Sequence, residues 1–244
     1  MISNKNLINK DLRRRLLEKG YETNSGHFGT ALSCLDAIKY LYDNVLREKD
    51  IFILSKGHGE MALFTVLESK GYKPAWTVHL DLNDAEGVHA TTGSLGHGLP
   101  IGLGRAYAKK IKNEEGRVYV LTGDGEMEEG SNWEALNIAN KLKIDNLILL
   151  VDWNKYQAVG AVQEVGGFNE KDLERRLGAF GCNTKIIDGH SYKGLSYLKN
   201  LEKGLQGVVL DTIKGKGIKC LEKTHDHGHA WTEEEYLKSL EGLQ

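Results

Sequence analysis

Cysteine and proline are scarce in this sequence. The three cysteines, Cys34, Cys182 and Cys220, are odd in number and lie at no spacing typical of a metal site. We therefore expect reduced thiols in a cytoplasmic protein. The only two prolines, Pro74 and Pro100, mark no linker, and no repeat or low-complexity segment interrupts the chain.

Long apolar runs and an excess of one charge are also missing. No run approaches the roughly 20 apolar residues that a membrane-spanning helix needs, and the basic N-terminus lacks the apolar core of a signal peptide. The 32 basic and 34 acidic residues leave a net charge of −2, so nothing suggests nucleic acid as a partner. With 40% hydrophobic residues, we expect residues 1–244 to form a single domain with a sizeable core.

A strand–helix–strand unit occupies the middle of the chain. Residues 118–121 form a short apolar run, which predicts a buried strand, and the glycine–aspartate–glycine sequence at 123–125 predicts a sharp turn. Ser131 and Glu134 have the spacing of a capping box, which predicts a helix start. Residues 147–151 form a second continuous apolar run, typical of a parallel strand covered on both faces.

Strands and amphipathic helices alternate along the whole chain. This alternation predicts an α/β fold with a mainly parallel sheet and helices on both faces. Ser94 is expected to cap a helix that ends near Lys112, and Ser33 with Asp36 resembles another cap. Further helices are expected at 5–20, 169–180, 191–204 and from Glu233, and further strands at 51–54, 183–187 and 207–213.

Two polar side chains follow the central strands. A right-handed crossover brings the carboxyl ends of parallel strands to one edge of the sheet, so Asp124 and Asn154 should share the crevice there. Carboxylate and amide oxygens are hard ligands that suit Mg²⁺ or Ca²⁺, and water and phosphate oxygens would complete the shell. Gly125 allows close approach of the backbone. The sequence therefore predicts a site for a metal and a diphosphate.

This joint pattern resembles the thiamine diphosphate signature, and the chain as a whole resembles the N-terminal, diphosphate-binding portion of transketolase. The matching pieces occur in the family's order and span nearly the whole chain. They are SGH-x-G at 25–29, SKGHG at 55–59, GV-x-x-TTGSLG at 87–96, GDG-x₃-EG at 123–130, D-x-N at 152–154 and HG at 227–228.

The resemblance implies a set of ligands. The metal ligands would be Asp124, Asn154 and the main-chain carbonyl of Tyr156. His58 and Gly125 would contact the diphosphate. The complete set implied to bind the cofactor is His58, Gly93, Leu95, Asp124, Gly125, Asn154 and His227.

The resemblance also assigns histidines to catalysis. His27, His79 and His227 would face the reacting sugar and handle its hydroxyl and carbonyl protons, a use that suits imidazole at neutral pH. Glu129 and Glu134 would lie near a subunit interface.

Two local features stand apart from the family pattern. Phe28 replaces the proline that usually follows the first histidine. His225, His227 and His229 alternate and would share one face of an extended segment. We interpret that segment as a flexible loop rather than as a zinc site.

Two of the family's components are not recognisable in this sequence. In transketolases the glutamate that activates the aminopyrimidine and the residues that bind the sugar phosphate lie in a second, pyrimidine-binding domain. We therefore expect a separate C-terminal transketolase subunit as partner in an α₂β₂ heterotetramer, and no activity of this chain alone.

The implied reaction transfers a two-carbon ketol (glycolaldehyde) unit from a ketose to an aldose, with sugars or sugar phosphates as substrates. Two alternatives stay open. The chain could belong to another thiamine diphosphate enzyme, either a 2-oxo acid dehydrogenase E1 α chain or a deoxyxylulose phosphate synthase. It could also be a non-catalytic binding subunit.

Overall fold

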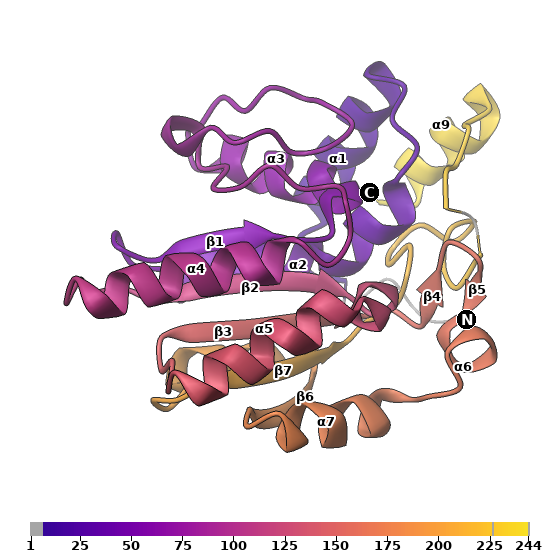
Figure 1. Ribbon diagram of the computed structural model, residues 1–244. Coiled ribbons are helices and arrows are strands. Elements are labelled where there is room, and N and C mark those ends of the chain that lie inside the picture. The colour runs from indigo at the N-terminus through magenta and orange to yellow at the C-terminus, as the bar shows by residue number, and fades with distance from the viewer. Residues whose placement is uncertain (1–6, 226, 244) are drawn as a thin grey trace.

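The computed structural model describes residues 7–225 and 227–243, and a five-stranded parallel sheet runs through its centre (Figure 1). The strand order is β1-β2-β3-β7-β6, and all neighbouring strands pair in parallel. The strands are β1 (Ile51–Leu54), β2 (Val118–Gly123), β3 (Leu147–Trp153), β6 (Asn183–Asp188) and β7 (Gln206–Asp211). The predicted mainly parallel sheet is confirmed.

Helices cover both faces of this sheet and bury a separate core on each (Figure 1). One core is packed by α1 (Lys10–Glu22), α2 (Phe28–Asn44), α3 (Glu60–Ser69) and α8 (Tyr192–Leu195). The other is packed by α4 (Gly98–Ile111), α5 (Gly130–Lys141) and α7 (Glu170–Ala179). The central strands β2 and β3 are buried at every position, which explains their continuous apolar sequence.

Short elements gather at the carboxyl edge of the sheet. An antiparallel hairpin of β4 (Tyr156–Gln157) and β5 (Gly160–Ala161) follows β3 there, with α6 (Val162–Val165) after it. The short 3-10 helices are η2 (Gly57–Gly59), η3 (Asp84–Glu86), η4 (Gly125–Glu128) and η5 (Ser196–Asn200). The last helix, α9 (Glu233–Glu241), lies against α1. No helix in the described ranges has both the length and the apolar character that a membrane crossing requires.

Two predicted helix caps are wrong. The Ser131 hydroxyl donates to the carbonyl of Gly96 at 2.7 Å, so it is used to hold a neighbouring loop, and α5 begins at Gly130. Ser94 lies in an irregular segment, and α4 begins only at Gly98. A capping pattern in the sequence cannot reveal that a hydroxyl has a tertiary partner.

A third predicted cap lies inside a helix. Ser33 and Asp36 are both buried within α2, which begins at Phe28. The Ser33 hydroxyl donates to the Asp152 carboxylate, and Asp36 forms a fully buried ion pair with Arg13 of α1. These polar side chains join elements instead of ending a helix.

Two helix extents also differ from the prediction. The helix expected at 5–20 begins at Lys10, and residues 5 and 6 lie outside the described part of the chain. The helix expected at 191–204 is reduced to α8 and η5, which end at Asn200.

Candidate active site

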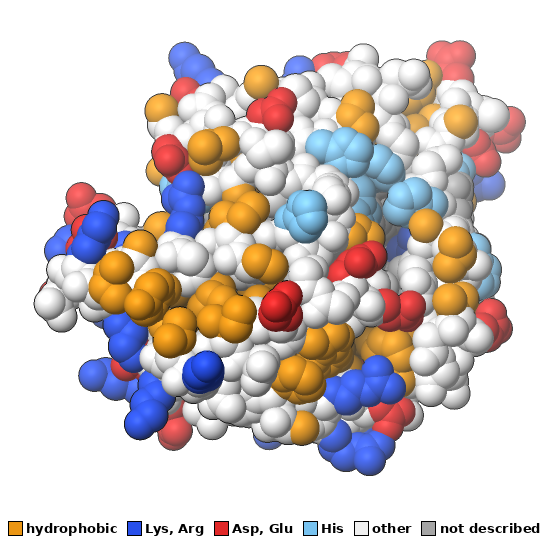
Figure 2. Space-filling view, viewed as in Figure 1, with side chains coloured by type: hydrophobic (Ala, Val, Ile, Leu, Met, Phe, Trp, Pro, Cys, Tyr) orange, Lys and Arg blue, Asp and Glu red, His pale blue; other side chains and the backbone are white. Residues whose placement is uncertain are grey.

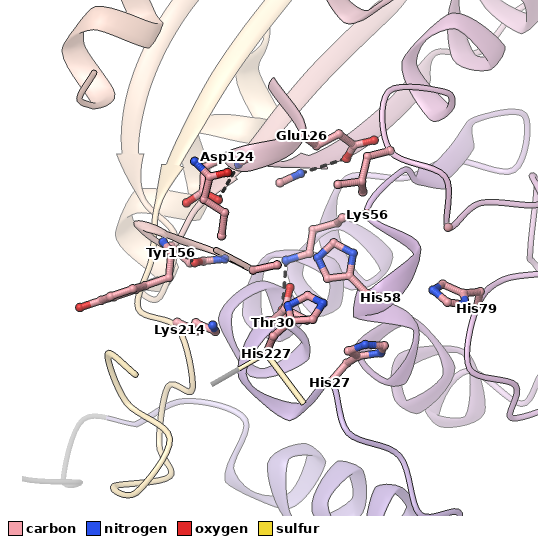
Figure 3. Close-up of a pocket in the computed structure, with 17 residues that line it drawn as sticks. His27, Thr30, Lys56, His58, His79, Asp124, Glu126, Tyr156, Lys214 and His227 are labelled. Atoms are coloured by element: carbon pink, nitrogen blue, oxygen red, sulfur yellow. Dashed lines mark hydrogen bonds between the residues drawn. The ribbon is translucent and has the colours of Figure 1, made fainter. Parts of the chain in front are cut away.

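A cavity of about 380 Å³ opens at the carboxyl edge of the sheet (Figure 3). Loops from almost the entire chain contribute to it, and all ten residues that the sequence nominated as metal, cofactor or catalytic groups line it. The lining residues are His27, Thr30, Lys56, His58, His79, Gly93, Leu95, Gly123, Asp124, Gly125, Glu126, Asn154, Tyr156, Gln157, Ala158, Lys214 and His227.

Asp124 is a buried carboxylate at the end of β2. One of its oxygens accepts a hydrogen bond from the N–H of Gly125 at 2.8 Å, and the other accepts from the N–H of Lys155 at 2.6 Å. Burial raises the pKa of Asp124 to about 7, and the nearby charge of Asp152 adds to the rise. A negative charge at this position is therefore costly until a cation compensates it.

Asn154 follows β3 and lies on the same cavity wall. β2 and β3 pair in register, with Gly123 opposite Asp152, so their ends lie side by side. The Asn154 amide donates to Asp152 at 3.4 Å, which leaves its oxygen on the other side, where it accepts from the N–H of Tyr156 at 3.1 Å. The link from Lys155 to Asp124 ties the two strand ends together.

The donor set fits a hard divalent cation. A carboxylate, an amide oxygen and a main-chain carbonyl, from Asp124, Asn154 and Tyr156, are all oxygen donors of the kind that Mg²⁺ and Ca²⁺ take. At Gly125 an added Cβ would lie 2.9 Å from the Cβ of Gln157, so a side chain there would crowd the site. These residues could hold a cation that shares its coordination shell with a diphosphate.

A buried ion pair that the sequence analysis missed joins Lys56 of the cavity lining to Asp152. Lys56 donates to the Asp152 carboxylate at 2.5 Å and to the carbonyl of Thr30 at 3.1 Å. Asp152 also accepts from the hydroxyls of Ser33 and Thr212, each at 2.5 Å. Lys56 and Asp152 are both fully buried. Burial alone would raise the pKa of Asp152, but Lys56 and the hydroxyls hold it below its usual value.

Lys56 and Asp152 lie inside the motifs at 55–59 and 152–154, so they were visible in the sequence. A lysine next to a strand end looks like a surface residue, however, and nothing local in the sequence reveals that it is buried.

Glu126 is a second buried carboxylate that the sequence analysis overlooked. It accepts from the Ser55 hydroxyl at 2.5 Å and from the N–H groups of Gly96 at 2.9 Å and Gly123 at 3.2 Å. Burial raises the pKa of Glu126. The side chain joins the ends of β1 and β2 to the loop that carries Leu95, and thereby fixes that loop on the cavity.

Four imidazoles meet at the mouth of the cavity (Figure 3). The ring of His27 lies 5.1 Å from that of His227 and 6.0 Å from those of His58 and His79, measured between centroids. Burial, the Lys56 charge and the other histidines lower the pKa of His58 well below its usual value. His58 is therefore a neutral imidazole at pH 7, surrounded by groups that can exchange protons with a polar ligand.

The three alternating histidines near the C-terminus do not share one face. The ring of His225 packs against Tyr156, with centroids 5.0 Å apart, and the ring of His229 packs against Trp231 at 4.4 Å. Only His227 belongs to the histidine cluster at the cavity. Within the described residues, no group of three or more His, Cys, Asp or Glu side chains is arranged to hold a metal.

Lys214 supplies another cationic side chain to the cavity, and sequence reasoning did not nominate it. It is 3% exposed, and its ammonium lies 5.8 Å from the centroid of the Tyr156 ring. The glycine–lysine alternation at 214–217 was the only local signal. A lysine so placed favours an anionic ligand in the cavity.

Comparisons with known proteins agree with this geometry. Residues 5–241 match the family described as transketolase, thiamine diphosphate binding domain. The chain is 33% identical to the 6-deoxy-6-sulfo-D-fructose transketolase subunit SqwG of a Clostridium species, over 96% of this chain and 94% of that protein. It is 32% identical to an apulose-4-phosphate transketolase subunit of Phocaeicola vulgatus, over 86% of this chain and 83% of that protein.

Solved structures agree as well. Transketolase from Campylobacter jejuni superimposes with a TM-score of 0.81 and 28% identity over 96% of this chain. The matched region is 42% of that protein, so this chain spans about two fifths of a full-length transketolase.

Proposed function

The chain belongs to the family of transketolase thiamine diphosphate-binding domains, and from this we propose that it is the metal- and diphosphate-binding subunit of a two-chain transketolase. One observation carries the proposal: motifs from six separate segments converge on a single cavity at the carboxyl edge of the sheet. In this reading residues 1–244 form one functional domain.

Thiamine diphosphate, when bound, supplies the carbon nucleophile for transfer of a two-carbon ketol unit from a ketose to an aldose. Asp124, Asn154 and the Tyr156 carbonyl hold Mg²⁺, or Ca²⁺, which carries the diphosphate. His58 and Gly125 contact the diphosphate itself. Gly93, Leu95 and His227 complete the cofactor contacts.

The cavity histidines act on the sugar. His27, His79 and His227 hold and move protons at its hydroxyl and carbonyl oxygens, since each imidazole can both donate and accept. His58 stays neutral beside Lys56 and so adds no further positive charge to the cluster.

The substrates are sugars or sugar phosphates. The two relatives described above are named for a sulfonated fructose and for apulose 4-phosphate. A panel of ketose donors that includes sulfonated and phosphorylated members therefore covers the substrate class.

A separate chain with the pyrimidine-binding domain completes the enzyme as an α₂β₂ heterotetramer. Relatives of nearly the same length are named subunits, which supports a partner. The three cysteines are free, and two of them are buried, as suits a cytoplasmic enzyme.

We expect the purified chain alone to show no ketol transfer, and the chain mixed with its partner to turn over hydroxypyruvate. The partner to test is a protein of the same organism that carries the pyrimidine-binding domain, with thiamine diphosphate and Mg²⁺ present. Transfer to an aldose acceptor is measured by product formation. Turnover of a ketose donor by this chain alone would contradict the proposed division between two subunits.

The same assay separates the alternatives. Preference for pyruvate over hydroxypyruvate would indicate a 2-oxo acid dehydrogenase or a deoxyxylulose phosphate synthase. A complex that binds neither thiamine diphosphate nor Mg²⁺ in a calorimetric titration would indicate a non-catalytic subunit.

The partner is proposed to dock on the outer face of α4 and α5. Apolar side chains gather there (Figure 2), and their exposed fractions lie between 38% and 61%. The helix α4 follows the loop of Leu95, which lines the cavity. The apolar residues are Ile101, Tyr107, Ile111, Ile138 and Leu142.

Replacing Ile138 with glutamate is expected to weaken association with the partner by tens of fold, because a charge at the core of an interface must lose its water. The measurement is the dissociation constant of the two chains by sedimentation or light scattering. Leu237→Glu on α9 is the matched control, because Leu237 is also an exposed aliphatic residue on a helix. Equal weakening by both variants would show that this face is not the docking site.

A further inference from the structure

The segment that brings His227 to the cavity crosses the loop that carries His27. The N–H of His229 donates to the carbonyl of Gly26 at 2.9 Å. The crossing is close, since a Cβ added to Gly26 would lie 3.3 Å from the Cα of Gly228. Two segments from opposite ends of the chain therefore touch through their backbones, immediately beside two cavity histidines.

An aromatic pair closes this crossing. Phe28 is fully buried, and the ring of Trp231 meets it edge-on, with centroids 5.2 Å apart and planes at 84°. Phe28 is itself immobilised, because its ring fills the space beside Gly20 of α1, where Met61 of α3 also lies. Trp231 also packs against the His229 ring, with centroids 4.4 Å apart. Phe28 is thus a rigid support for Trp231.

Both ends of the crossing segment are anchored. Thr232, next to Trp231, caps α9 in a capping box with Glu235. Tyr236 of α9 stacks on Tyr21 of α1, with centroids 3.9 Å apart and planes at 7°. Upstream, the N–H of Gly215 donates to the carbonyl of Gly29 at 2.8 Å. The contacts at these anchors fix where the segment that carries His227 enters and leaves the crossing.

We propose that Phe28 and Trp231 are positioning residues whose edge-on contact sets the spacing of His27 and His227. Phe28 directly follows His27 in the chain, and Trp231 follows His227 by four residues. Neither ring is among the described residues that line the cavity, so the pair acts only through the histidines. The catalytic consequence rests on the proposed function, whereas the structural consequence does not.

The test uses the complex of this chain with its partner and the variants Phe28→Leu, Trp231→Leu and Phe28→Leu/Trp231→Leu. Backbone amide exchange is followed by mass spectrometry. In Trp231→Leu we expect at least tenfold faster exchange in both segments, 25–29 and 227–230, because the crossing opens. The double variant should exchange no faster than the single ones, since both changes remove the same contact.

Kinetics provide the second readout. In Trp231→Leu we expect kcat to fall about tenfold or more, because His27 and His227 are no longer held at their proper spacing. The affinity for thiamine diphosphate with Mg²⁺ should change at most about threefold. Trp231→Phe retains an aromatic edge and should restore both exchange and kcat. Phe180→Leu is the matched control, because it removes a similar phenylalanine–tryptophan contact, with Trp133 at 5.1 Å, in the other core. It should leave exchange in the two segments unchanged.

Unchanged exchange of 25–29 in Trp231→Leu, or rate increases that multiply in the double variant, would overturn the proposal. Failure of the unmodified complex to transfer a ketol unit would instead overturn the proposed function, and the exchange experiment would still decide the role of the aromatic pair.

Discussion

Replacing Asp124 with asparagine is expected to lower the affinity for thiamine diphosphate with Mg²⁺ by more than roughly 100-fold, since loss of outer-shell groups alone typically costs 10–100-fold. The substitution removes the carboxylate from the proposed metal ligands and keeps its shape. Calorimetric titration of the variant and the parent chain measures the effect. The Asp211→Asn variant is the control, because Asp211 is a half-exposed carboxylate that pairs with Lys155 at 2.6 Å, outside the cavity lining.

The same substitution is expected to remove most of the pH dependence of the stability of the cofactor-free protein, apart from a pH-independent cost, because the amide replaces one of the two oxygens that accept backbone N–H bonds. The folded pKa of Asp124 is about 7, above the ordinary value of 3.8, so the folded state binds this proton more tightly than the unfolded state does. Stability of the cofactor-free chain therefore falls as pH rises from about 4 to about 7 and is level beyond that. A rise of about three pKa units at 1.36 kcal/mol each corresponds to a loss on the order of 4 kcal/mol.

Urea unfolding at pH 5 and pH 8 checks this expectation. The parent chain should lose stability between the two values, and Asp124→Asn should lose markedly less. Burial also raises the pKa of Glu126, so Glu126 makes stability fall as pH rises in both proteins. Its contribution therefore cancels when the two proteins are compared. An identical pH dependence in the variant, or wild-type affinity for the cofactor, would contradict the role given to Asp124.

Replacing Lys56 with methionine is expected to destabilise the fold by about 3–5 kcal/mol, because it leaves the Asp152 charge buried without its partner. Burial lowers the pKa of Lys56, but the Asp152 carboxylate more than offsets this, so the lysine is charged in the parent protein. Removing both charges in Lys56→Met/Asp152→Asn should recover most of the loss. Urea unfolding of the parent, of Lys56→Met, of Asp152→Asn and of the double variant measures the cycle.

An exposed ion pair supplies the control for this cycle. Lys155 and Asp211 are about half exposed, and Lys155→Met should cost less than about 1 kcal/mol. If Lys56→Met cost no more than Lys155→Met, or if the double variant were less stable than Lys56→Met, the buried pair would not organise the site as described.

The sequence reveals most of the fold because its signals are local. Continuous apolar runs at 118–121 and 147–151 identify strands buried on both faces, and a parallel sheet then places Asp124 and Asn154 at one edge. The motifs fall at strand ends and in glycine-rich loops, which explains why every nominated residue lines one cavity. Their individual chemical roles stay predictions.

The groups that sequence reasoning missed are those whose partners are distant in the chain. Ser33 and Ser131 look like helix caps until their tertiary acceptors are known. Lys56 reads as an exposed lysine, although Asp152 and Thr30 surround it. The pattern of residues within ten positions of such a group in the sequence carries no information about its contacts with distant segments.

The crossing of the His27 loop by the His229 segment also constrains how the protein is made. The ribosome releases β2, β3 and the Asp124 edge long before residues 227–231 emerge, and contacts between such distant segments form slowly. A nascent chain can thus hold a folded scaffold while its histidine cluster is still incomplete. Ligand binding that depends on the histidine cluster is thereby postponed until residues 227–231 have joined the His27 loop.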